Sequence, residues 1–528
     1  MRKIFTITLL ILIAASVALS VFISTYFWWL AGFFIAIFCL GVYDMVQTHH
    51  SVMRNFPLFG RARWLMEYLR PKLYQYFVES DTDGRPINRI DRSTIYQRAK
   101  KQTDSMPFGT QLDVYAEGYE WMTHSIAPLN FTSLNHDPRI TIGNKDCKQP
   151  YSASIFNVSA MSFGSLSYAA IEALNSGAKI GNFAHNTGEG GLSPYHLKHG
   201  GDIIWQIGTG YFSARTADGN FSPEAFQKNA TLPQVKMIEL KLSQGAKPGH
   251  GGILPAAKNT AEIAAIRLVT PNTTVYSPPY HSAFDSPKGL VQFIQQLKEL
   301  SGGKPVGFKL CIGHKSEFIG ICKAMIELDS YPDFITVDGG EGGTGAAPQE
   351  FSNYVGAPLM DGLAFVHNML MGFNIKQHIK IIASGKVLSG FHLIRAMALG
   401  ADACNSARAM MMALGCIQAL QCNTNKCPTG VATQDKGLVK GLVIDDKKQR
   451  VANYHEDTIK TFVELLGAAG IADCNKLTRS HIYRRVFMNE VRTFEDIYPT
   501  CAVGCMTNGN IPEKYKHDVE KASAERWN

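Results

Sequence analysis

The sequence predicts an α/β protein, a (β/α)8 TIM barrel behind an N-terminal hairpin of two transmembrane helices. β-rich runs alternate with helical stretches through the middle of the chain, as such a barrel requires. Glycines and charges concentrate just after these runs, where the active face of a barrel lies. Two apolar stretches occupy the first 45 residues, and 528 residues are enough for one large domain with appendages.

The N-terminal hairpin is predicted from length and charge. Residues 4–23 carry no charge, and a second apolar stretch covers residues 27–43. Each is close to the ~20 residues that cross the hydrocarbon core of a bilayer. Arg2 and Lys3 precede the first stretch and Arg54 follows the second, so the positive-inside rule places both outer ends in the cytoplasm. We therefore expect a multi-pass protein of the inner (cytoplasmic) membrane with its catalytic domain in the cytoplasm. A cleaved signal peptide is the alternative, but eleven cysteines suit a reducing compartment.

Four segments are expected along the chain. They are the hairpin (1–45), a connecting segment packed on the barrel (46–130), the barrel with its cysteine loop (131–440) and a helical extension (441–528). The net charge of +8 is spread out, and no run of Lys and Arg is dense enough to indicate nucleic-acid binding. Cys501 and Cys505 near the C-terminus have a spacing that is weak evidence for a redox couple, and we interpret them as packing residues.

Eight runs are the expected barrel strands. They are residues 154–160, 181–186, 236–242, 274–277, 305–311, 334–337, 379–383 and 403–406. Helix-like segments lie between them at 260–268, 288–300, 315–328, 362–370 and 390–399. An open doubly wound sheet is the competing architecture, but it would carry a G-x-G-x-x-G turn after its first strand, and none occurs there.

Five loops after these runs are expected to carry the chemistry. They are residues 159–165, 186–191, 239–252 (after the third expected strand), 338–346 and 384–386. Glycine lets a backbone approach a flat ring or a phosphate without a Cβ in the way. Any one of these loops is explained by a tight turn, but five at successive strand ends predict a large, planar, phosphorylated cofactor.

Three cysteines, Cys416, Cys422 and Cys427, form a compact group that ends at a Cys-Pro step. Such groups are typical of iron–sulfur ligation, because the proline ends the local helix and turns the last sulfur inward. A structural zinc site needs a fourth ligand, and no Cys or His lies close by in the sequence. Buried free cysteines are the alternative. The spacing favours an open-cornered cluster and therefore electron transfer.

These motifs resemble the FMN-binding synthase domain of glutamate synthase large subunits. The resemblance is closest to shorter, stand-alone glutamate synthase-like proteins with an N-terminal membrane segment. It is carried by residues 160–165, 186–191, 244–249 and 342–346, and by a cysteine spacing that matches the family's [3Fe–4S] site. It covers a little over half of the chain and implies a (β/α)8 barrel, an FMN cofactor and a cluster that passes electrons to the flavin.

The cofactor residues are expected at the strand ends. FMN phosphates usually bind the loops after the last two strands of a barrel, which here offer Gly385, Lys386 and Arg408. Lys309, at the end of the fifth strand, is expected beside the flavin ring, and a salt-bridged barrel lysine is its alternative role. The other expected cofactor contacts are Ala160, Met161, Ser162, Asn186, Lys241, Gln244, Gly342, Gly343 and Thr344.

Lys247 and Arg267 are the expected partners of the substrate's carboxylates, since a guanidinium suits a dicarboxylate. Lys247 and Gln244 match the family motif, whereas Arg267 is assigned only by its spacing from Lys247. Glu189, between glycines, is expected either to handle a proton or to tie loops together. Glu189 and Lys247 are the expected catalytic residues.

The resemblance implies an oxidoreductase of glutamate biosynthesis and nitrogen metabolism. Reduced FMN would reduce an imine made from 2-oxoglutarate, or a similar 2-oxo acid, and ammonia. The large enzymes begin with a glutaminase domain and its N-terminal cysteine, whereas this chain begins with Met1 and Arg2. Ammonia is therefore expected from solution or from a separate subunit that releases it from glutamine. Electrons are expected from an external donor such as ferredoxin or a reductase subunit. A membrane-linked FMN amino-acid dehydrogenase and a non-catalytic redox relay subunit are the alternatives.

Overall fold

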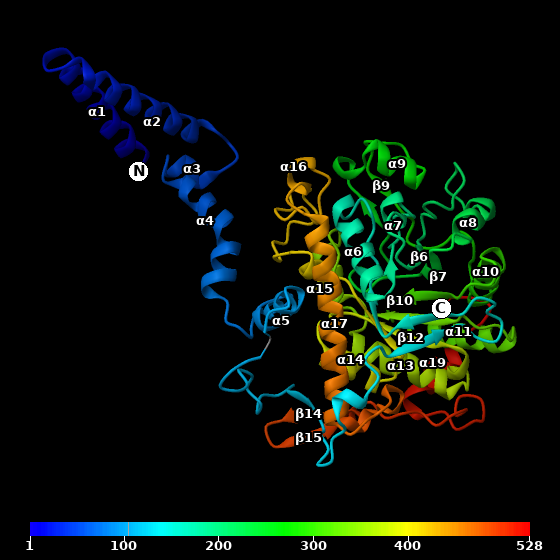
Figure 1. Cartoon of the computed structure of the whole chain (residues 1–528). Coiled ribbons are helices and arrows are strands. Elements are labelled where there is room, and N and C mark those ends of the chain that lie inside the picture. The colour runs from blue at the N-terminus through cyan, green and yellow to red at the C-terminus, as the bar shows by residue number, and fades with distance from the viewer. Residues whose placement is uncertain (104, 528) are drawn as a thin grey trace. The chain divides into compact units, whose positions relative to one another are not determined.

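The computed structural model describes residues 1–103 and 105–527, and the chain divides into two compact units, Met1–Arg89 and Ile90–Asn528. The first unit is helical (Figure 1). Its elements are α1 (Arg2–Phe22), the turn η1 (Thr25–Phe27), α2 (Trp28–Val46), α3 (Ser51–Asn55), α4 (Gly60–Leu73) and the π-helical turn η2 (Tyr74–Val78).

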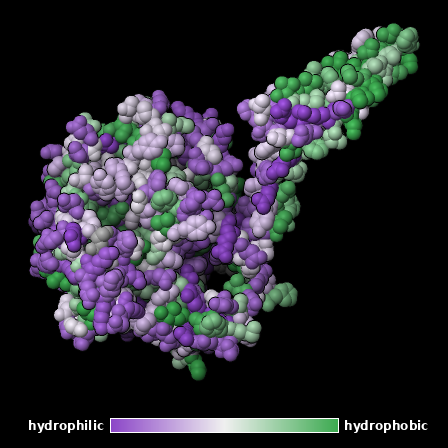
Figure 2. Space-filling model, turned by 180° about the vertical axis from the view of Figure 1, so that it is seen from behind, coloured by the Kyte–Doolittle hydropathy of each residue, from purple (hydrophilic) through white to green (hydrophobic). Residues whose placement is uncertain are grey.

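The helices α1 and α2 lie side by side as a hairpin (Figure 1). The segments Arg2–Phe22 and Thr25–Val46 are long and apolar enough to cross a membrane, although a signal sequence near the N-terminus meets the same test of length and composition. Large apolar side chains on the hairpin, such as Ile11 and Phe33, are exposed, and Figure 2 shows the hairpin as a mostly hydrophobic surface.

Eight parallel strands close into the barrel of the second unit, which confirms the predicted fold class (Figure 1). In chain order the strands are β4 (Phe156–Val158), β5 (His185–Asn186), β6 (Ile203–Ile207), β7 (Val235–Lys241), β10 (Val306–Leu310), β11 (Phe334–Asp338), β12 (Lys380–Ser384) and β13 (Ala403–Ser406). The barrel closes where β13 pairs with β4.

One of the eight predicted strands is wrong. Residues 274–277 contain β9 (Val275–Tyr276), which pairs antiparallel with β8 (Ile253–Leu254) outside the barrel. The missing barrel strand is β6, whose residues are all buried. A short run that is buried on both faces and bounded by glycines has no alternating pattern to separate it from a loop. The loop that carries Gln244 and Lys247 therefore follows the fourth strand, not the third.

Helices occupy all five of the predicted helical segments. These are α9 (Ala261–Arg267), α10 (Pro287–Leu300), α11 (Lys315–Glu327), α13 (Leu359–Gly372) and α14 (Gly390–Ala398). In α10, the Ser286 hydroxyl accepts the N–H of Gly289, and proline follows at the first helical position. The other helices of this region are α5 (Arg89–Ala99), α6 (Tyr168–Gly181), α7 (Pro194–Leu197), α8 (Pro223–Ala230), α12 (Gln349–Tyr354) and α15 (Arg408–Ala413).

The C-terminal extension is not helical throughout. After α16 (Lys436–Val439), the long helix α17 (Ile444–Ala468) packs on α6 and α14. A three-stranded sheet then forms, in which β14 (Ile482–Phe487) pairs with β15 (Glu490–Thr493) and with β1 (Glu120–Met122) from before the barrel. Short helices α18 (Phe494–Ile497) and α19 (Glu513–Lys521) complete the chain.

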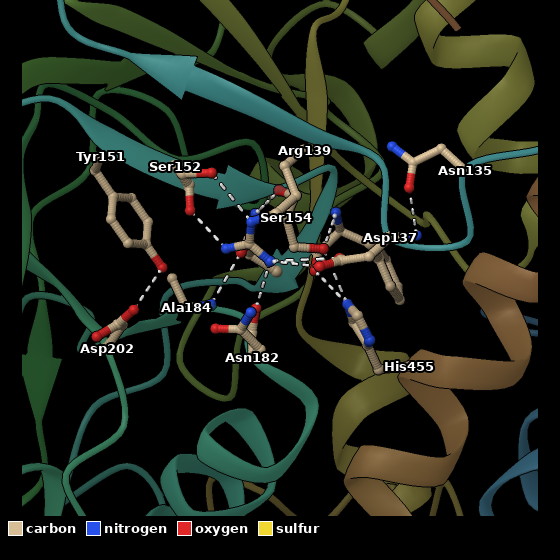
Figure 3. Close-up of polar contacts among 12 residues, drawn as sticks. Asn135, Asp137, Arg139, Tyr151, Ser152, Ser154, Asn182, Ala184, Asp202 and His455 are labelled. Carbon is tan, nitrogen blue, oxygen red and sulfur yellow. Dashed lines mark hydrogen bonds and ion pairs between the residues drawn. The ribbon is translucent and has the colours of Figure 1, made fainter. Parts of the chain in front are cut away.

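A hairpin of two strands, β2 (Arg139–Ile142) and β3 (Tyr151–Ser154), lies at the amino-terminal end of the barrel (Figure 3). Arg139 donates to the carbonyl of Asn182 at 2.9 Å, and the Tyr151 hydroxyl donates to Asp202 at 2.9 Å. Asn182 and Asp202 come just before β5 and β6. The hairpin therefore covers the amino-terminal end of the barrel, opposite the loops predicted to carry the chemistry.

Candidate active site

The predicted loops meet at the carboxyl-terminal end of the barrel. The N–H of Met161 donates to the carbonyl of Asn186 at 3.2 Å, which joins the loops after β4 and β5. The N–H of Gly245 donates to Asp338 Oδ2 at 2.7 Å, which joins the loop after β7 to the end of β11. Residues far apart in the sequence thus form one site.

Several loop glycines are required by contacts between the loops themselves. A Cβ on Gly245 would lie 1.7 Å from the carbonyl oxygen of Gly339. A Cβ on Gly190 would lie 2.6 Å from Ser162 Cβ and 2.8 Å from a guanidinium nitrogen of Arg267. These close approaches explain glycine without a cofactor. The glycine pattern alone is therefore weaker evidence for a planar ligand than the sequence suggests. The charged residues of the site indicate a ligand more strongly.

Glu189 is the centre of the charged group. Its Oε1 lies 2.9 Å from Lys241 Nζ. Burial alone would raise the pKa of Glu189, but the positive charges of Lys241, Lys247 and Arg267 together hold it below its ordinary value. Glu189 is thus an ionised hydrogen-bond acceptor at neutral pH, held among three cations.

Lys241, the last residue of β7, is held from several directions. Its Nζ donates to Gln244 Oε1 at 2.6 Å in addition to its ion pair with Glu189. Its backbone carbonyl is 2.8 Å from His281 Nε2, and His281 Nδ1 is 3.1 Å from the Tyr211 hydroxyl. The buried pair His281 and Tyr211 therefore positions the end of β7, a role that no sequence motif indicates.

Lys247 is only 3% exposed, and its Nζ donates to the carbonyl of Gly251 at 2.9 Å. Burial lowers the pKa of Lys247, while Glu189 opposes that shift. Among the residues that the structure describes, Lys247 forms no direct ion pair. Its charge is therefore available to an anionic ligand.

Arg267, at the end of α9, is also buried, and its guanidinium lies beneath the loops. One terminal nitrogen donates to the carbonyl of Phe163 at 3.1 Å, and the guanidinium carbon lies 5.1 Å from the ring centroid of Phe212. Within the described part of the chain, its Nε has no hydrogen-bond partner. Burial lowers the pKa of Arg267 to about 10, with Glu189 opposing the shift. A buried guanidinium with an unused donor is suited to bind a carboxylate. The charge of Arg267 thus acts on Glu189, the same carboxylate on which Lys247 acts.

Lys309 forms the ion pair expected for its alternative role, that of a salt-bridged lysine of the barrel. Its Nζ lies 3.4 Å from Asp338 Oδ2, and both residues are buried. Asp338 is an unexpected participant, since it also accepts the N–H of Gly245. The ammonium remains at the end of β10, where the sequence places it.

The predicted phosphate-binding residues lie at neighbouring strand ends. Gly385 follows β12 with φ +149°, and a Cβ there would lie 3.3 Å from the N–H nitrogen of Gly339. Arg408 opens α15 and donates to the carbonyl of Glu341 at 2.7 Å. Burial lowers the pKa of Arg408, and Asp338 and Glu341 oppose that shift. Lys386 follows Gly385 directly, so a guanidinium, an ammonium and backbone N–H groups are available to a phosphate.

The other predicted cofactor contacts differ in what they touch. Asn186 donates to Glu239 Oε1 at 2.8 Å and accepts the N–H of Gly188 at 3.0 Å, so its amide faces the barrel interior. Thr344 is exposed, and Gly343 lies against Arg408. Ala160, Met161, Ser162 and Gly342 lie in the loops after β4 and β11.

The three predicted cluster ligands come together after α15. Burial, together with the nearby Cys422 and Cys427, raises the pKa of Cys416 to about 11. Burial and Cys427 likewise raise the pKa of Cys422. Burial would raise the pKa of Cys427 too, but hydrogen bonds from Thr429 and from backbone N–H groups outweigh it. Through these mutual electrostatic effects the three thiols belong to one neighbourhood of the structure.

The cysteine group does not resemble a site for a single metal ion. Among residues 1–103 and 105–527, no three His, Cys, Asp or Glu side chains have the geometry to hold one ion. Three thiols without a fourth ligand fit an open-cornered cluster better than tetrahedral zinc.

Lys258 joins the cysteine group to the rest of the site, and no motif in the sequence points to it. Its buried ammonium donates to the carbonyls of Cys422 at 2.9 Å, Ser165 at 3.3 Å and Ala432 at 3.3 Å. One cation beside the thiols thus joins the loop after β4 to two points of the loop between α15 and α16.

Comparison with known proteins identifies a family that matches most of the second unit. A family model described as the conserved region in glutamate synthase matches residues 90–472. The glutamate synthase large subunit-like protein YerD of Bacillus subtilis is 37% identical over 481 residues, covering 84% of this chain and 91% of that protein. An archaeal glutamate synthase (NADPH) of Methanocaldococcus jannaschii is 36% identical over 321 residues, covering 61% of this chain and 60% of that protein. The chain thus spans less than two thirds of the second relative.

Solved structures give a weaker likeness. A flavocytochrome b2 mutant with benzoylformate has a TM-score of 0.42 and 12% identity, covering 79% of this chain and 85% of that one. This likeness is too weak to assign a cofactor.

Proposed function

Because the chain belongs to the glutamate synthase family, we propose that it converts 2-oxoglutarate, or a similar 2-oxo acid, and ammonia into the amino acid. The relatives are named for an oxidoreductase that acts on CH–NH2 groups, in agreement with the predicted enzyme class. The observation that carries the proposal is the group of Lys241, Lys247 and Arg267 around one carboxylate, Glu189.

The charge of this group matches a dianion. Three cations face one carboxylate, so two positive charges remain to be balanced. A dicarboxylate supplies two negative charges, and a charge-assisted hydrogen bond is roughly twice as strong as a neutral one. A redox relay without a substrate would not need two buried cations that lack an ion pair.

Lys247 and Arg267 would bind the two carboxylates of 2-oxoglutarate. Glu189 would accept hydrogen bonds from the attacking amine, and Lys241, 2.9 Å from Glu189, would hold a proton for the imine nitrogen. Condensation of the 2-oxo acid with ammonia releases water, and two electrons and two protons then convert the imine into the amino acid. Burial of both cations keeps water from competing for the carboxylates.

FMN, when bound, supplies the hydride. Gly385, Lys386 and Arg408 would hold its phosphate, and Lys309 would lie near the ring, with its charge shared with Asp338. Cys416, Cys422 and Cys427 would hold a [3Fe–4S] cluster, and the electrons would come from a separate donor such as ferredoxin or a reductase subunit. Ammonia would come from solution or from a subunit that releases it from glutamine.

We also propose that residues 1–45 anchor the enzyme in the inner (cytoplasmic) membrane with the barrel in the cytoplasm. Supporting observations are the two apolar helices Arg2–Phe22 and Thr25–Val46 and the positive charges at their outer ends.

The test is a flavin reoxidation assay. The protein is purified anaerobically in detergent, reduced with light, and mixed with ammonium and one 2-oxo acid from a panel. We expect saturable reoxidation with 2-oxoglutarate and formation of glutamate. A 2-oxo acid with one carboxylate should bind about 10- to 100-fold more weakly, because one charge-assisted contact is missing. Reduction of the oxidised flavin by glutamate, with no reoxidation by 2-oxoglutarate, would instead indicate an amino-acid dehydrogenase.

A further inference from the structure

The helix α4 and the turn η2 carry an exposed apolar stripe. Leu65, Met66, Leu73 and Tyr76 are 44–55% exposed, and Phe77 is 81% exposed. Together with Ala62 and Leu69, they recur every three or four residues, the spacing of one helix face. A soluble protein rarely leaves such a continuous apolar stripe in contact with water.

Basic residues border this stripe on both sides. With 3.6 residues per turn, Arg63 and Arg70 lie along one edge of the apolar stripe and Lys72 along the other. The Lys72 ammonium lies 3.5 Å from the ring centroid of Tyr68, a cation–π contact on the helix surface, and the residue is exposed. Glu67 is the single acidic residue of α4. An apolar stripe between basic edges is typical of helices that lie in a membrane interface.

A buried ion pair sets the direction in which α4 leaves α2. Asp44, near the end of α2, is fully buried, and its Oδ1 lies 2.6 Å from a terminal nitrogen of Arg61. Asp44 Oδ2 also accepts the N–H of Leu58 at 3.0 Å. A Cβ on Gly60 would lie 2.7 Å from Met53 Cα, so the start of α4 is pressed against α3. Arg61 is used in this elbow, and Arg63 lies 3.9 Å from Glu67 in an exposed ion pair within α4. Arg63, Arg70 and Lys72 are all exposed, so an external anion can reach them.

We propose that α4 and η2 lie along the membrane surface, with the apolar stripe in the headgroup boundary and Arg63, Arg70 and Lys72 on anionic phospholipid headgroups. The proposal rests on the proposed membrane anchor. The elbow of Asp44 and Arg61 joins α4 to the end of the second apolar helix, so a hairpin in the bilayer delivers α4 to the bilayer's surface. Anionic headgroups complement the basic edges, and acyl chains complement the stripe.

The other candidate occupant is a protein surface, such as the barrel unit. A protein partner would cover the stripe whatever the charge of the lipid, whereas binding of the stripe to a membrane depends on that charge. Each basic residue near an anionic surface contributes about fivefold in binding, the equivalent of ~1 kcal/mol. Three such residues therefore predict a lipid dependence of about 100-fold.

The test is hydrogen–deuterium exchange of the full chain in nanodiscs of phosphatidylcholine alone or with phosphatidylglycerol. Amides of residues 60–78 should exchange about 100-fold more slowly in the anionic discs. The variant Arg63→Glu/Arg70→Glu/Lys72→Glu should lose this difference. Reversal of three exposed lysines of the second unit, Lys228, Lys440 and Lys476, is the matched control and should preserve it.

A photo-crosslinking benzoylphenylalanine in place of Phe77 identifies the occupant directly. Lipid adducts are expected. Adducts within the protein, with equal protection in both kinds of disc, would show that a protein surface covers the stripe and would overturn the proposal. Equally fast exchange in both kinds of disc would also overturn it while leaving the anchor intact. Failure of the chain to enter the discs would reject the anchor and the proposal together, without touching the proposed reaction.

Discussion

The substitution Lys247→Met tests the assignment of the substrate site. Methionine is unbranched and flexible, so it can follow the path of the lysine stem while removing the charge. Lys247 is 3% exposed and donates to the carbonyl of Gly251 at 2.9 Å. The substitution therefore removes a buried cation and one hydrogen bond without adding bulk.

Two costs follow, and they are measured separately. Loss of a charge-assisted contact with a carboxylate should cost ~1.5–3 kcal/mol of binding, which is about one to two decades in the Kd for 2-oxoglutarate. The carbonyl of Gly251 keeps a second partner, because His250 Nδ1 lies 2.9 Å from it. Loss of the lysine's hydrogen bond should therefore cost only ~0.5–1.5 kcal/mol in the free energy of unfolding. Titration of flavin fluorescence with 2-oxoglutarate measures the first, and thermal unfolding in detergent measures the second.

Lys304→Met is the matched control. Lys304 is also buried, and its Nζ donates to the carbonyls of Ala230 and Leu232, each at 2.7 Å. It comes just before β10, at the amino-terminal end of the barrel. This variant should lose at least as much stability, because two carbonyls lose their lysine donor, and it should keep the affinity for 2-oxoglutarate.

The pH dependence supplies a second check on Lys247. The cation binds only when protonated, so affinity is present below its pKa and is lost as the pH rises through it. Burial places the pKa of Lys247 below the ordinary 10.5 and that of Arg267 at about 10. The affinity of the wild type for 2-oxoglutarate should fall in the alkaline range up to about pH 10. In the Lys247→Met variant, the part of this pH dependence that comes from deprotonation of Lys247 should be absent. Equal affinities of wild type, Lys247→Met and Lys304→Met, with flavin retained, would refute the assignment.

Three further predictions concern other parts of the molecule. Cys422→Ser should remove most of the expected ~3 irons per chain while sparing FMN, because the flavin contacts lie in other loops; zinc in the anaerobically purified wild type would contradict the cluster. Burial lowers the pKa of His455 and of His392 to about 3, so neutral histidine stabilises the fold above the unfolded value of about 6.5 and this contribution is lost as the pH falls from there towards 3. The free energy of unfolding should therefore drop by about 1.4 kcal/mol per pH unit for each of them, and a stability that is flat between pH 7 and 5 would speak against buried neutral rings. Deletion of residues 1–45 should leave a coloured protein that salt washes from membranes, and a C-terminal reporter active only outside the cytoplasm would reverse the topology.

The barrel was predictable because most of its strands are apolar runs that end in a loop with glycine or charge. The alternation of such runs with amphipathic helices is a local property of the chain. The strand β6 escaped this pattern, and β9 imitated it, because two short β-rich runs of similar composition differ only in what covers them. Tyr276 of β9 is 71% exposed, whereas every residue of β6 is buried.

Periodicity and motifs of neighbouring residues are enough to predict the barrel class, the apolar hairpin, the cysteine group and most of the charged site residues. Which of these charges are paired can be learned only from the folded chain. Lys309 is neutralised by Asp338, while Lys247 keeps its charge without an ion pair among the described residues. The structure likewise revealed Lys258 beside the thiols and His281 behind Lys241. Such contacts join strands and loops far apart along the chain, so their distances are set by closure of the barrel and leave no local pattern in the sequence.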